Sequence, residues 1–300
     1  MKSLLYRFSR KYMLGKFDFW ERHGIHITPV SYYSPIPNTK KLKEKYPSEI
    51  PEIMEGFDWN EKGQIKIMHE VFPLYAQECS EFSQTERERT NVYDYYVQNQ
   101  LFPIGDACIL HSLIRHFKPG KIIEIGSGFS TLVAARAATY VTPAPMLKSI
   151  NPFPGQFEDL FQDGFPGFTC LEKTPVEDLP LEYFDQLQEG DMLFIDSSHV
   201  IRPMEDVLFL YLKVIPRLNP GVIVHAHDIF LPYHMPKEFV FEKHWFWNEQ
   251  YLLQALLTFN SEYEVLFSAQ YMKKYKEESQ SIFPEYWPGG SFWFRRKNKT

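Results

Sequence analysis

The chain of 300 residues is poor in cysteine and has no long apolar run. Its three cysteines, Cys79, Cys108 and Cys170, are widely spaced and odd in number, which suits neither a disulfide framework nor a zinc site. We therefore expect a reducing compartment, with the cytoplasm as the default. No apolar run reaches the roughly 20 residues that cross a bilayer, so we expect no transmembrane segment. The N-terminus also lacks the apolar stretch of a signal peptide.

An excess of positive charge is missing as well. The 32 basic and 38 acidic residues give a net charge of -6, so the protein as a whole has no electrostatic attraction for nucleic acid. The hydrophobic share of 44% is large enough for a full core. We therefore expect a folded protein rather than a disordered one.

Residues 1–95 form an irregular N-terminal extension in the predicted organisation. The stretch "HITPVSYYSPIPNTKKL" carries three prolines among tyrosines and serines, which favours extended segments and short helices. Its function has two equal interpretations: a lid or substrate wall over an active site, or a packing arm that joins two copies in a homodimer.

From about residue 96 the chain alternates between strand-like and helix-like segments. Predicted strands are "KIIEIG" (121–126), "MLKSIN" (146–151), "FTCLEK" (168–173), "DMLFID" (191–196) and "GVIVHAHDI" (221–229). Predicted helices span 107–117, 130–140, 204–218 and 247–260. The alternation predicts an α/β, doubly wound, Rossmann-like sheet over residues 96–300. Two further strand-like runs, "YEVLFSAQY" and "SFWFRRK", have no convincing helix between them, which favours a hairpin at one sheet edge.

A glycine-rich turn, "EIGSGFST", follows the first predicted strand and opens a helix. Doubly wound folds bind nucleotide-like ligands at this place. Gly126 and Gly128 allow a tight turn and a close approach to the ligand, and Glu124 ends the strand with an acid. The third glycine of the dinucleotide fingerprint is absent, which disfavours NAD.

The segment "IIEIGSGFST" resembles the cofactor loop of class I S-adenosylmethionine-dependent methyltransferases. "GDMLFIDSSHV" and "IPRLNPGVIVHAHDIFLP" resemble the branch that methylates oxygen on small molecules and sugars. The resemblance spans about residues 100–300. It implies the strand order 3-2-1-4-5-7-6, S-adenosyl-L-methionine as cofactor, and Glu124, Gly126, Ser127, Gly128 and Ser130 as cofactor-binding residues.

Two further cofactor contacts follow from position along the predicted strands. Asn151 ends the second strand, where the family usually has an acid that binds the ribose. An amide still bonds a hydroxyl but supplies no charge-assisted bond. Glu177, after the third strand, is placed near the adenine or caps a helix.

Asp196 and Asp228 end the fourth and fifth strands, so both are expected at the carboxyl edge of the sheet. Two converging carboxylates repel unless a cation or a proton separates them. Acids at these strand ends resemble the metal sites of catechol and sugar O-methyltransferases, which implies a divalent metal such as Mg²⁺. Ile229 stands where that pattern has a third ligand. Metal binding through Asp196 and Asp228, with or without a histidine, therefore stays open.

Histidines lie beside both aspartates, and an imidazole accepts a hydroxyl proton at neutral pH. His199 and His227 are the candidate bases or ligands. His225 should point the same way as His227 and is interpreted as structural, with Asp228 on the opposite face if the strand stays regular. Trp247, Asn248 and Glu249 open a helix at this edge, with Asn248 as its expected cap.

The sequence thus predicts a methyltransferase that uses S-adenosyl-L-methionine. Asp196 and Asp228 orient an acceptor hydroxyl, and His199 or His227 takes the proton. Two alternatives keep the fold. One is a metal-dependent enzyme of different chemistry, and the other is a non-catalytic binding or scaffold protein, which Asn151 would suit.

Overall fold

The computed structural model describes residues 11–47, 51–283 and 289–298. The described residues fall into two compact units. The larger takes in Glu49–Met235 and Trp247–Thr300, and the smaller takes in Met1–Ser48 and Pro236–Phe246, so far as these are described. No helix within the described ranges is long and apolar enough to cross a membrane.

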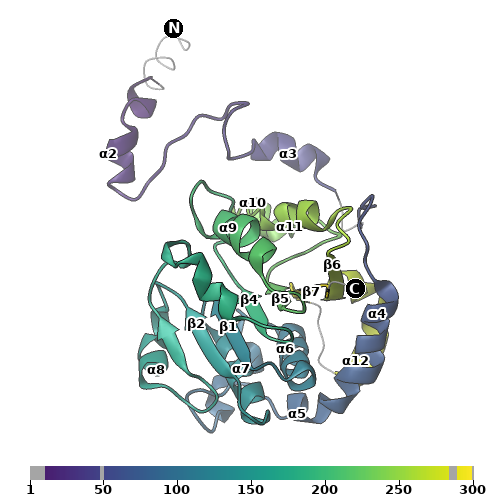
Figure 1. The fold of residues 1–300 in the computed structure, drawn as a ribbon. Coiled ribbons are helices and arrows are strands. Elements are labelled where there is room, and N and C mark those ends of the chain that lie inside the picture. The colour runs from purple at the N-terminus through teal and green to yellow at the C-terminus, as the bar shows by residue number, and fades with distance from the viewer. Residues whose placement is uncertain (1–10, 48–50, 284–288, 299–300) are drawn as a thin grey trace. The chain divides into compact units, whose positions relative to one another are not determined.

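The larger unit is built on a seven-stranded sheet with the order β3-β2-β1-β4-β5-β7-β6 (Figure 1). Strand β7 runs antiparallel to both of its neighbours, and the pairs from β3 to β5 are parallel. The predicted fold class and strand order are therefore confirmed. The strands are β1 (Lys121–Ile125), β2 (Met146–Ile150), β3 (Cys170–Glu172), β4 (Met192–Ile195), β5 (Ile223–Ala226), β6 (Tyr263–Ser268) and β7 (Phe292–Arg296).

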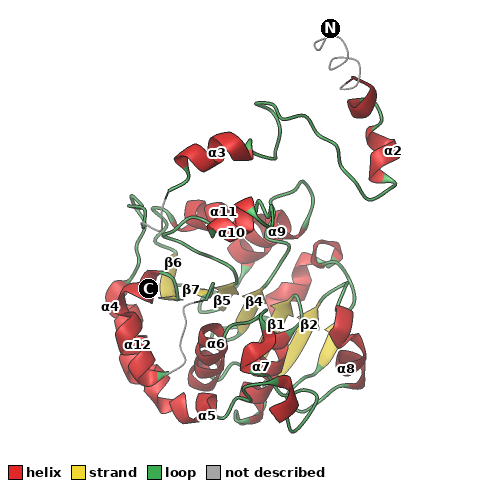
Figure 2. Ribbon diagram, turned by 180° about the vertical axis from the view of Figure 1, so that it is seen from behind, coloured by secondary structure: helices red, strands yellow, loops and turns green. Residues whose placement is uncertain are grey.

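Helices cover both faces of this sheet because its central strands are buried on both sides. Helices α6 and α7 pack on one face (Figure 2), and the segment from α9 to η9 packs with α11 on the other. The α-helices are α2 (Phe17–Glu21), α3 (Thr39–Lys45), α4 (Glu61–Lys66), α5 (Ala76–Ser80), α6 (Ile104–Phe117), α7 (Phe129–Thr139), α8 (Glu158–Asp163), α9 (Asp206–Phe209), α10 (Lys237–Phe241), α11 (Glu249–Leu257) and α12 (Lys276–Ile282). Shorter 3₁₀ and π turns join them, including η1 (Ile67–Val71), η6 (Val176–Asp178), η8 (Leu210–Val214), η9 (Ile215–Arg217) and η10 (Tyr271–Tyr275).

The link between β6 and β7 contradicts the expectation of a helix-free hairpin. The two strands do pair antiparallel, but η10 and α12 lie between them in the chain. Only a narrow stripe of this segment is buried, including Met272 and Ser279. A helix that buries so few apolar residues leaves little periodic signal in its sequence, which is why the helix was missed.

Much of the chain before residue 96 belongs to the core of the larger unit. Met68, Phe72 and Phe82 are buried in the same cluster as α6 and α7. The side chain of Gln64 on α4 accepts a hydrogen bond from the backbone N–H of Ser268 at 2.8 Å. The packing boundary thus lies at Glu49, and a functional boundary at residue 95 stays a prediction.

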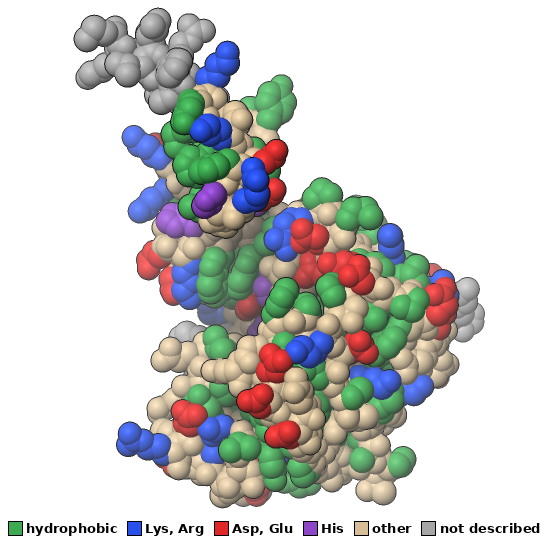
Figure 3. Space-filling model, turned by 90° about the vertical axis from the view of Figure 1, so that its left-hand side faces the viewer, with side chains coloured by type: hydrophobic (Ala, Val, Ile, Leu, Met, Phe, Trp, Pro, Cys, Tyr) green, Lys and Arg blue, Asp and Glu red, His purple; other side chains and the backbone are tan. Residues whose placement is uncertain are grey.

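The smaller unit buries little of its apolar surface. None of the residues of α2 or α3 is buried, and Tyr32 and Tyr33 are almost fully exposed. Figure 3 shows apolar and basic side chains together on this unit. The Lys16 ammonium, for example, lies 4.2 Å from the ring centre of Tyr12. Such pairs cover aromatic faces without forming a core.

Candidate active site

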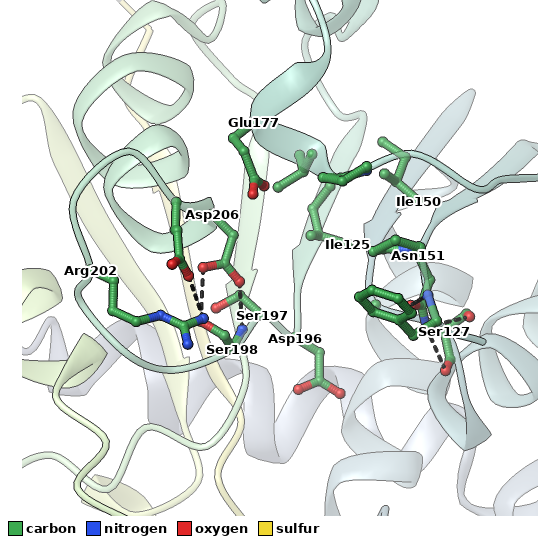
Figure 4. A pocket seen from close by; sticks show the side chains of 16 residues that line it. Ile125, Ser127, Ile150, Asn151, Glu177, Asp196, Ser197, Ser198, Arg202 and Asp206 are labelled. Atoms are coloured by element: carbon green, nitrogen blue, oxygen red, sulfur yellow. Dashed lines mark hydrogen bonds and ion pairs between the residues drawn. The ribbon is translucent and has the colours of Figure 1, made fainter. Parts of the chain in front are cut away.

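Two cavities lie at the carboxyl ends of the parallel strands, and they share Ser127 and Asp196. The first cavity, of about 500 Å³, runs from the glycine turn past Asn151 and Glu177 to the loop after β4 (Figure 4). The second cavity, of about 550 Å³, runs from the same turn to the loop after β5. A ligand that extends along the turn would therefore reach both.

The two glycines of the turn serve different purposes. Gly126 has a φ of +84°, and a Cβ there would lie 2.3 Å from the carbonyl oxygen of Asp196. Packing of the chain alone therefore requires glycine at this position. A Cβ on Gly128 would meet only the ring of Phe157 at 3.9 Å, an ordinary contact. Gly128 lines the second cavity, so its missing side chain leaves room there.

Glu124 is buried and lines neither cavity. Its carboxylate accepts hydrogen bonds from Ser130 Oγ at 2.7 Å and Thr131 Oγ1 at 2.6 Å. Burial raises the pKa of this carboxyl to about 7, although the two hydroxyls oppose the rise. The structure thus places Glu124 behind the turn. Ser130, which donates a hydrogen bond to Glu124, does line the second cavity.

Asn151 and Glu177 both line the first cavity. The Asn151 amide donates to Ser127 Oγ at 2.9 Å, and its Oδ1 accepts from the backbone N–H of Phe153 at 2.8 Å. These bonds tie the end of β2 to the glycine turn. The Glu177 side chain comes from η6 and points into the cavity (Figure 4).

The opposite wall of the first cavity was missed by sequence reasoning. It is the loop from Ser197 to Asp206. Asp206 accepts hydrogen bonds from the backbone N–H of Ser198 at 2.7 Å and from its hydroxyl at 2.8 Å. Arg202 pairs with Glu205 on the same loop. The sequence did contain one signal for this wall. Asp206 stands at the start of a helix, a position where carboxylates accept hydrogen bonds from free backbone N–H groups.

All four predicted catalytic residues line the second cavity: Asp196, His199, His227 and Asp228. His199 Nε2 lies 3.2 Å from Asp196 Oδ1 and 3.8 Å from Asp228 Oδ2. His227 Nε2 lies 4.0 Å from Asp228 Oδ1. His199 and Asp228 both adopt left-handed φ values, +60° and +53°. Strained backbone of this kind gathers at functional sites.

The pKa values of three side chains in this cluster are shifted from their ordinary values. Burial lowers the pKa of His199, but hydrogen bonds to Asp196 and Glu249 outweigh it and raise the pKa well above its ordinary value. Burial also opposes ionisation of Asp196, yet the bond from His199 and the charge of His227 keep the pKa of Asp196 low. For His227 the nearby aspartates outweigh burial, so its pKa is raised. The attraction between the two histidines and Asp196 thus favours the charged form of each of these three groups.

His225 is adjacent to the cluster but lines neither cavity. Its ring lies 5.6 Å from that of His227 and stacks on Phe194 at 4.0 Å. Its Nε2 lies 3.2 Å from Ser291 Oγ, and burial lowers its pKa well below the ordinary value. Strand β5 ends at Ala226, and the left-handed backbone of Asp228 brings that carboxylate to the side of His227.

The start of α11 completes the wall of the second cavity. The Trp247 ring lies 4.4 Å from the ring of His199. Asn248 occupies the N-cap position of α11, as expected, but its side chain makes no capping bond, because its Oδ1 accepts from the backbone N–H of Ile201 at 2.6 Å. Glu249 is buried and lies 2.8 Å from His199 Nδ1. The helix therefore contacts the histidine loop through its backbone and its first side chains.

A metal has few ligands available in this arrangement. Within residues 11–47, 51–283 and 289–298, no group of three or more His, Cys, Asp or Glu side chains is placed to hold a metal ion. The residue after Asp228 is the buried, apolar Ile229. These side chains therefore do not form a donor set that fits a divalent metal, and the chemistry assigned to this site does not depend on one.

Residues 123–229 match a family described as a methyltransferase domain. An uncharacterised protein of Archaeoglobus fulgidus is 29% identical over 174 residues, which are 56% of this chain and 76% of that protein. The O-methyltransferase TomG of Streptomyces achromogenes, involved in tomaymycin synthesis and solved with SAM, has 17% identity and a TM-score of 0.42, covering 82% of this chain and 100% of its own. An O-methyltransferase of Bacillus cereus solved with SAH has 10% identity and a TM-score of 0.39, covering 80% and 98%.

The family match runs from Ile123 in β1 to Ile229 after β5 and includes both predicted aspartates, and the sheet has the order that the resemblance implied. Residues 123–229 are thus similar to a methyltransferase domain, and they lie on a sheet with the strand order expected for the class I fold.

Proposed function

We propose that the protein transfers a methyl group from S-adenosyl-L-methionine to a hydroxyl oxygen of a small molecule or glycan. One observation carries the proposal. The second cavity brings Asp196, Asp228 and His227 together beside the glycine turn. Carboxylates accept hydrogen bonds from hydroxyl groups, and an imidazole removes a hydroxyl proton.

The cofactor is assigned to both cavities. Asn151 and Glu177 in the first cavity are proposed to bind the ribose and the adenine. Gly128 and Ser130 in the second are proposed to lie beside the methionine part. In this arrangement Glu124 acts from behind the turn, since it lines neither cavity, and Gly126 lines the first cavity with its backbone.

The transfer step needs alignment and the removal of one proton. The acceptor oxygen attacks the methyl carbon, the carbon–sulfur bond breaks, and the sulfonium becomes a neutral thioether. The hydroxyl proton passes to the neutral form of His227, whose Nε2 lies 4.0 Å from Asp228 Oδ1. Asp228 accepts a hydrogen bond from the acceptor and orients its oxygen. Positioning of this kind supplies most of the rate acceleration in a displacement between two substrates.

The walls of the second cavity favour a ring-shaped acceptor. Phe102, Phe129, Phe157 and Trp247 supply flat apolar surface, and the two aspartates supply hydrogen-bond acceptors. A sugar or a phenol with adjacent hydroxyls combines these features. The proposal also includes a lid or substrate wall formed by residues 1–95, a homodimer and a cytoplasmic location.

Isothermal titration with S-adenosylmethionine and S-adenosylhomocysteine tests the cofactor first. Micromolar binding is expected, followed by turnover on sugar or phenol acceptors. Asp228→Ala should remove turnover and leave cofactor affinity nearly unchanged, because Asp228 is assigned to the acceptor. Asp159→Ala, an exposed position outside both cavities, is the matched control. Absence of cofactor binding would reject the proposal and favour a scaffold protein.

A further inference from the structure

The imidazole of His199 stands among three carboxylates. Its Nε2 faces Asp196 at 3.2 Å and Asp228 at 3.8 Å, and its Nδ1 faces Glu249 at 2.8 Å. Glu249 keeps only 2% of its surface exposed. The ring thus lies where a cation is needed, between two carboxylates at neighbouring strand ends.

The hydrogen-bond partners of the His199 ring determine its protonation state. Ionised carboxylates accept hydrogen bonds and donate none. A neutral imidazole has one N–H, so it can satisfy a carboxylate on one side only. With carboxylates at both nitrogens, the ring donates from both and bears a positive charge. The imidazolium therefore separates Asp196 from Asp228 and offsets their repulsion.

Backbone contacts hold His199 in this position. Its carbonyl oxygen accepts hydrogen bonds from the N–H groups of Asn248 at 2.9 Å and Glu249 at 3.2 Å. Trp247 packs on the ring at 4.4 Å. The left-handed φ of His199 is thereby stabilised by three consecutive residues at the start of α11. The carbonyl bonds hold the backbone of His199, and rotation of the ring would break its contacts with Trp247, Asp196 and Glu249.

We propose that His199, positioned by Glu249, takes the place that a divalent metal holds in metal-dependent O-methyltransferases, so that this protein needs no metal. That His199 occupies the place of a metal follows from the geometry of the three carboxylates. That turnover needs no metal rests on the proposed methyl transfer. A carboxylate behind a histidine also occurs in metal sites. Such sites need several donors around one centre, and the described part of the chain has no such group.

Mn²⁺ binding to the purified protein tests this inference directly. The wild type, dialysed against EDTA, should show no stoichiometric Mn²⁺ site, and its turnover should be the same in EDTA and in Mn²⁺. His199→Asn leaves the two aspartates without their cation, so Mn²⁺ should bind this variant about tenfold or more tightly than the wild type. His234→Asn, which changes a histidine outside both cavities, should gain no Mn²⁺ affinity.

Glu249→Gln tests the positioning role. The amide keeps the size of the side chain but removes its charge, so the imidazolium should be held less firmly. Mn²⁺ affinity should then rise toward that of His199→Asn, and kcat should fall while the KM for the cofactor stays constant. A purely structural role would not create affinity for Mn²⁺.

Two results would overturn the inference. One is stoichiometric Mn²⁺ binding by the wild type, and the other is turnover that EDTA abolishes and Mn²⁺ restores. The Mn²⁺ titration needs no substrate, so it remains decisive if a variant folds poorly or if the acceptor is unknown. Failure of the proposed function would appear separately, as absence of S-adenosylmethionine binding in the same wild-type preparation.

Discussion

Glu124→Gln should change how the stability of the larger unit depends on pH. The carboxyl is buried, and its pKa rises from an ordinary 4.5 to about 7. Each pKa unit corresponds to about 1.4 kcal/mol, so ionising this group in the folded protein costs about 3 kcal/mol. Glutamine has about the same size and does not titrate, so the difference between the two proteins isolates the cost of ionising Glu124.

The direction follows from which state loses its proton first. Below pH 4.5 the carboxyl is protonated in both states and adds no pH dependence. Between pH 4.5 and 7 the unfolded chain releases its proton while the folded chain keeps it, so stability falls as pH rises. Above pH 7 both states are ionised, and the penalty stays constant. The free energy of unfolding of Glu124→Gln relative to wild type should thus increase by about 3 kcal/mol across this range.

Urea unfolding of both proteins at pH 4.5 and pH 8, followed by circular dichroism, measures this difference. Any constant effect of the amide on its two hydroxyl partners cancels between the two pH values. Glu55→Gln, at an exposed position, is the control for the change of charge. If the difference between Glu124→Gln and wild type is the same at both pH values, the argument from burial is wrong.

Four other perturbations give distinct results. Gly126→Ala should prevent stable folding, seen as loss of the cooperative thermal transition, because its Cβ meets the Asp196 carbonyl oxygen at 2.3 Å. Gly128→Ala should keep the transition temperature but weaken S-adenosylhomocysteine binding about tenfold to a hundredfold, the range expected when a methyl group overfills a packed site. Asn151→Asp should bind the cofactor about fivefold more tightly if it restores a charge-assisted bond to the ribose; unchanged affinity would place the ribose elsewhere. Because the pKa of His227 is raised above its ordinary value, the neutral base forms at a higher pH than in a free imidazole, so kcat/KM should increase as pH rises from 6 to 8, and a profile that is flat or falls there would exclude this base.

Most of the sheet was predictable because its strands carry strong local signals. Strand β4 is a continuous apolar run, strands β1 and β5 are mostly apolar, and each of the three precedes a turn or a polar residue. Such runs suit strands buried on both faces. The end of β5 also gave the correct neighbourhood for Asp228, since parallel strands end at one edge. Helix α12 was missed because it buries only a narrow stripe of residues.

The sequence by itself determined the seven strands, the helices between the parallel strands that carry strong periodicity, the glycine turn and the two strand-end aspartates, because each depends on residues close together in the chain. The tertiary structure alone decided which groups surround each of these residues. Glu124 and Ser130 meet across a turn, whereas His199 and Glu249 lie 50 positions apart. No local pattern links the second pair, since their contact depends on how α11 packs over the loop after β4. That packing puts an imidazolium between the two aspartates, a place for which the sequence had suggested a metal.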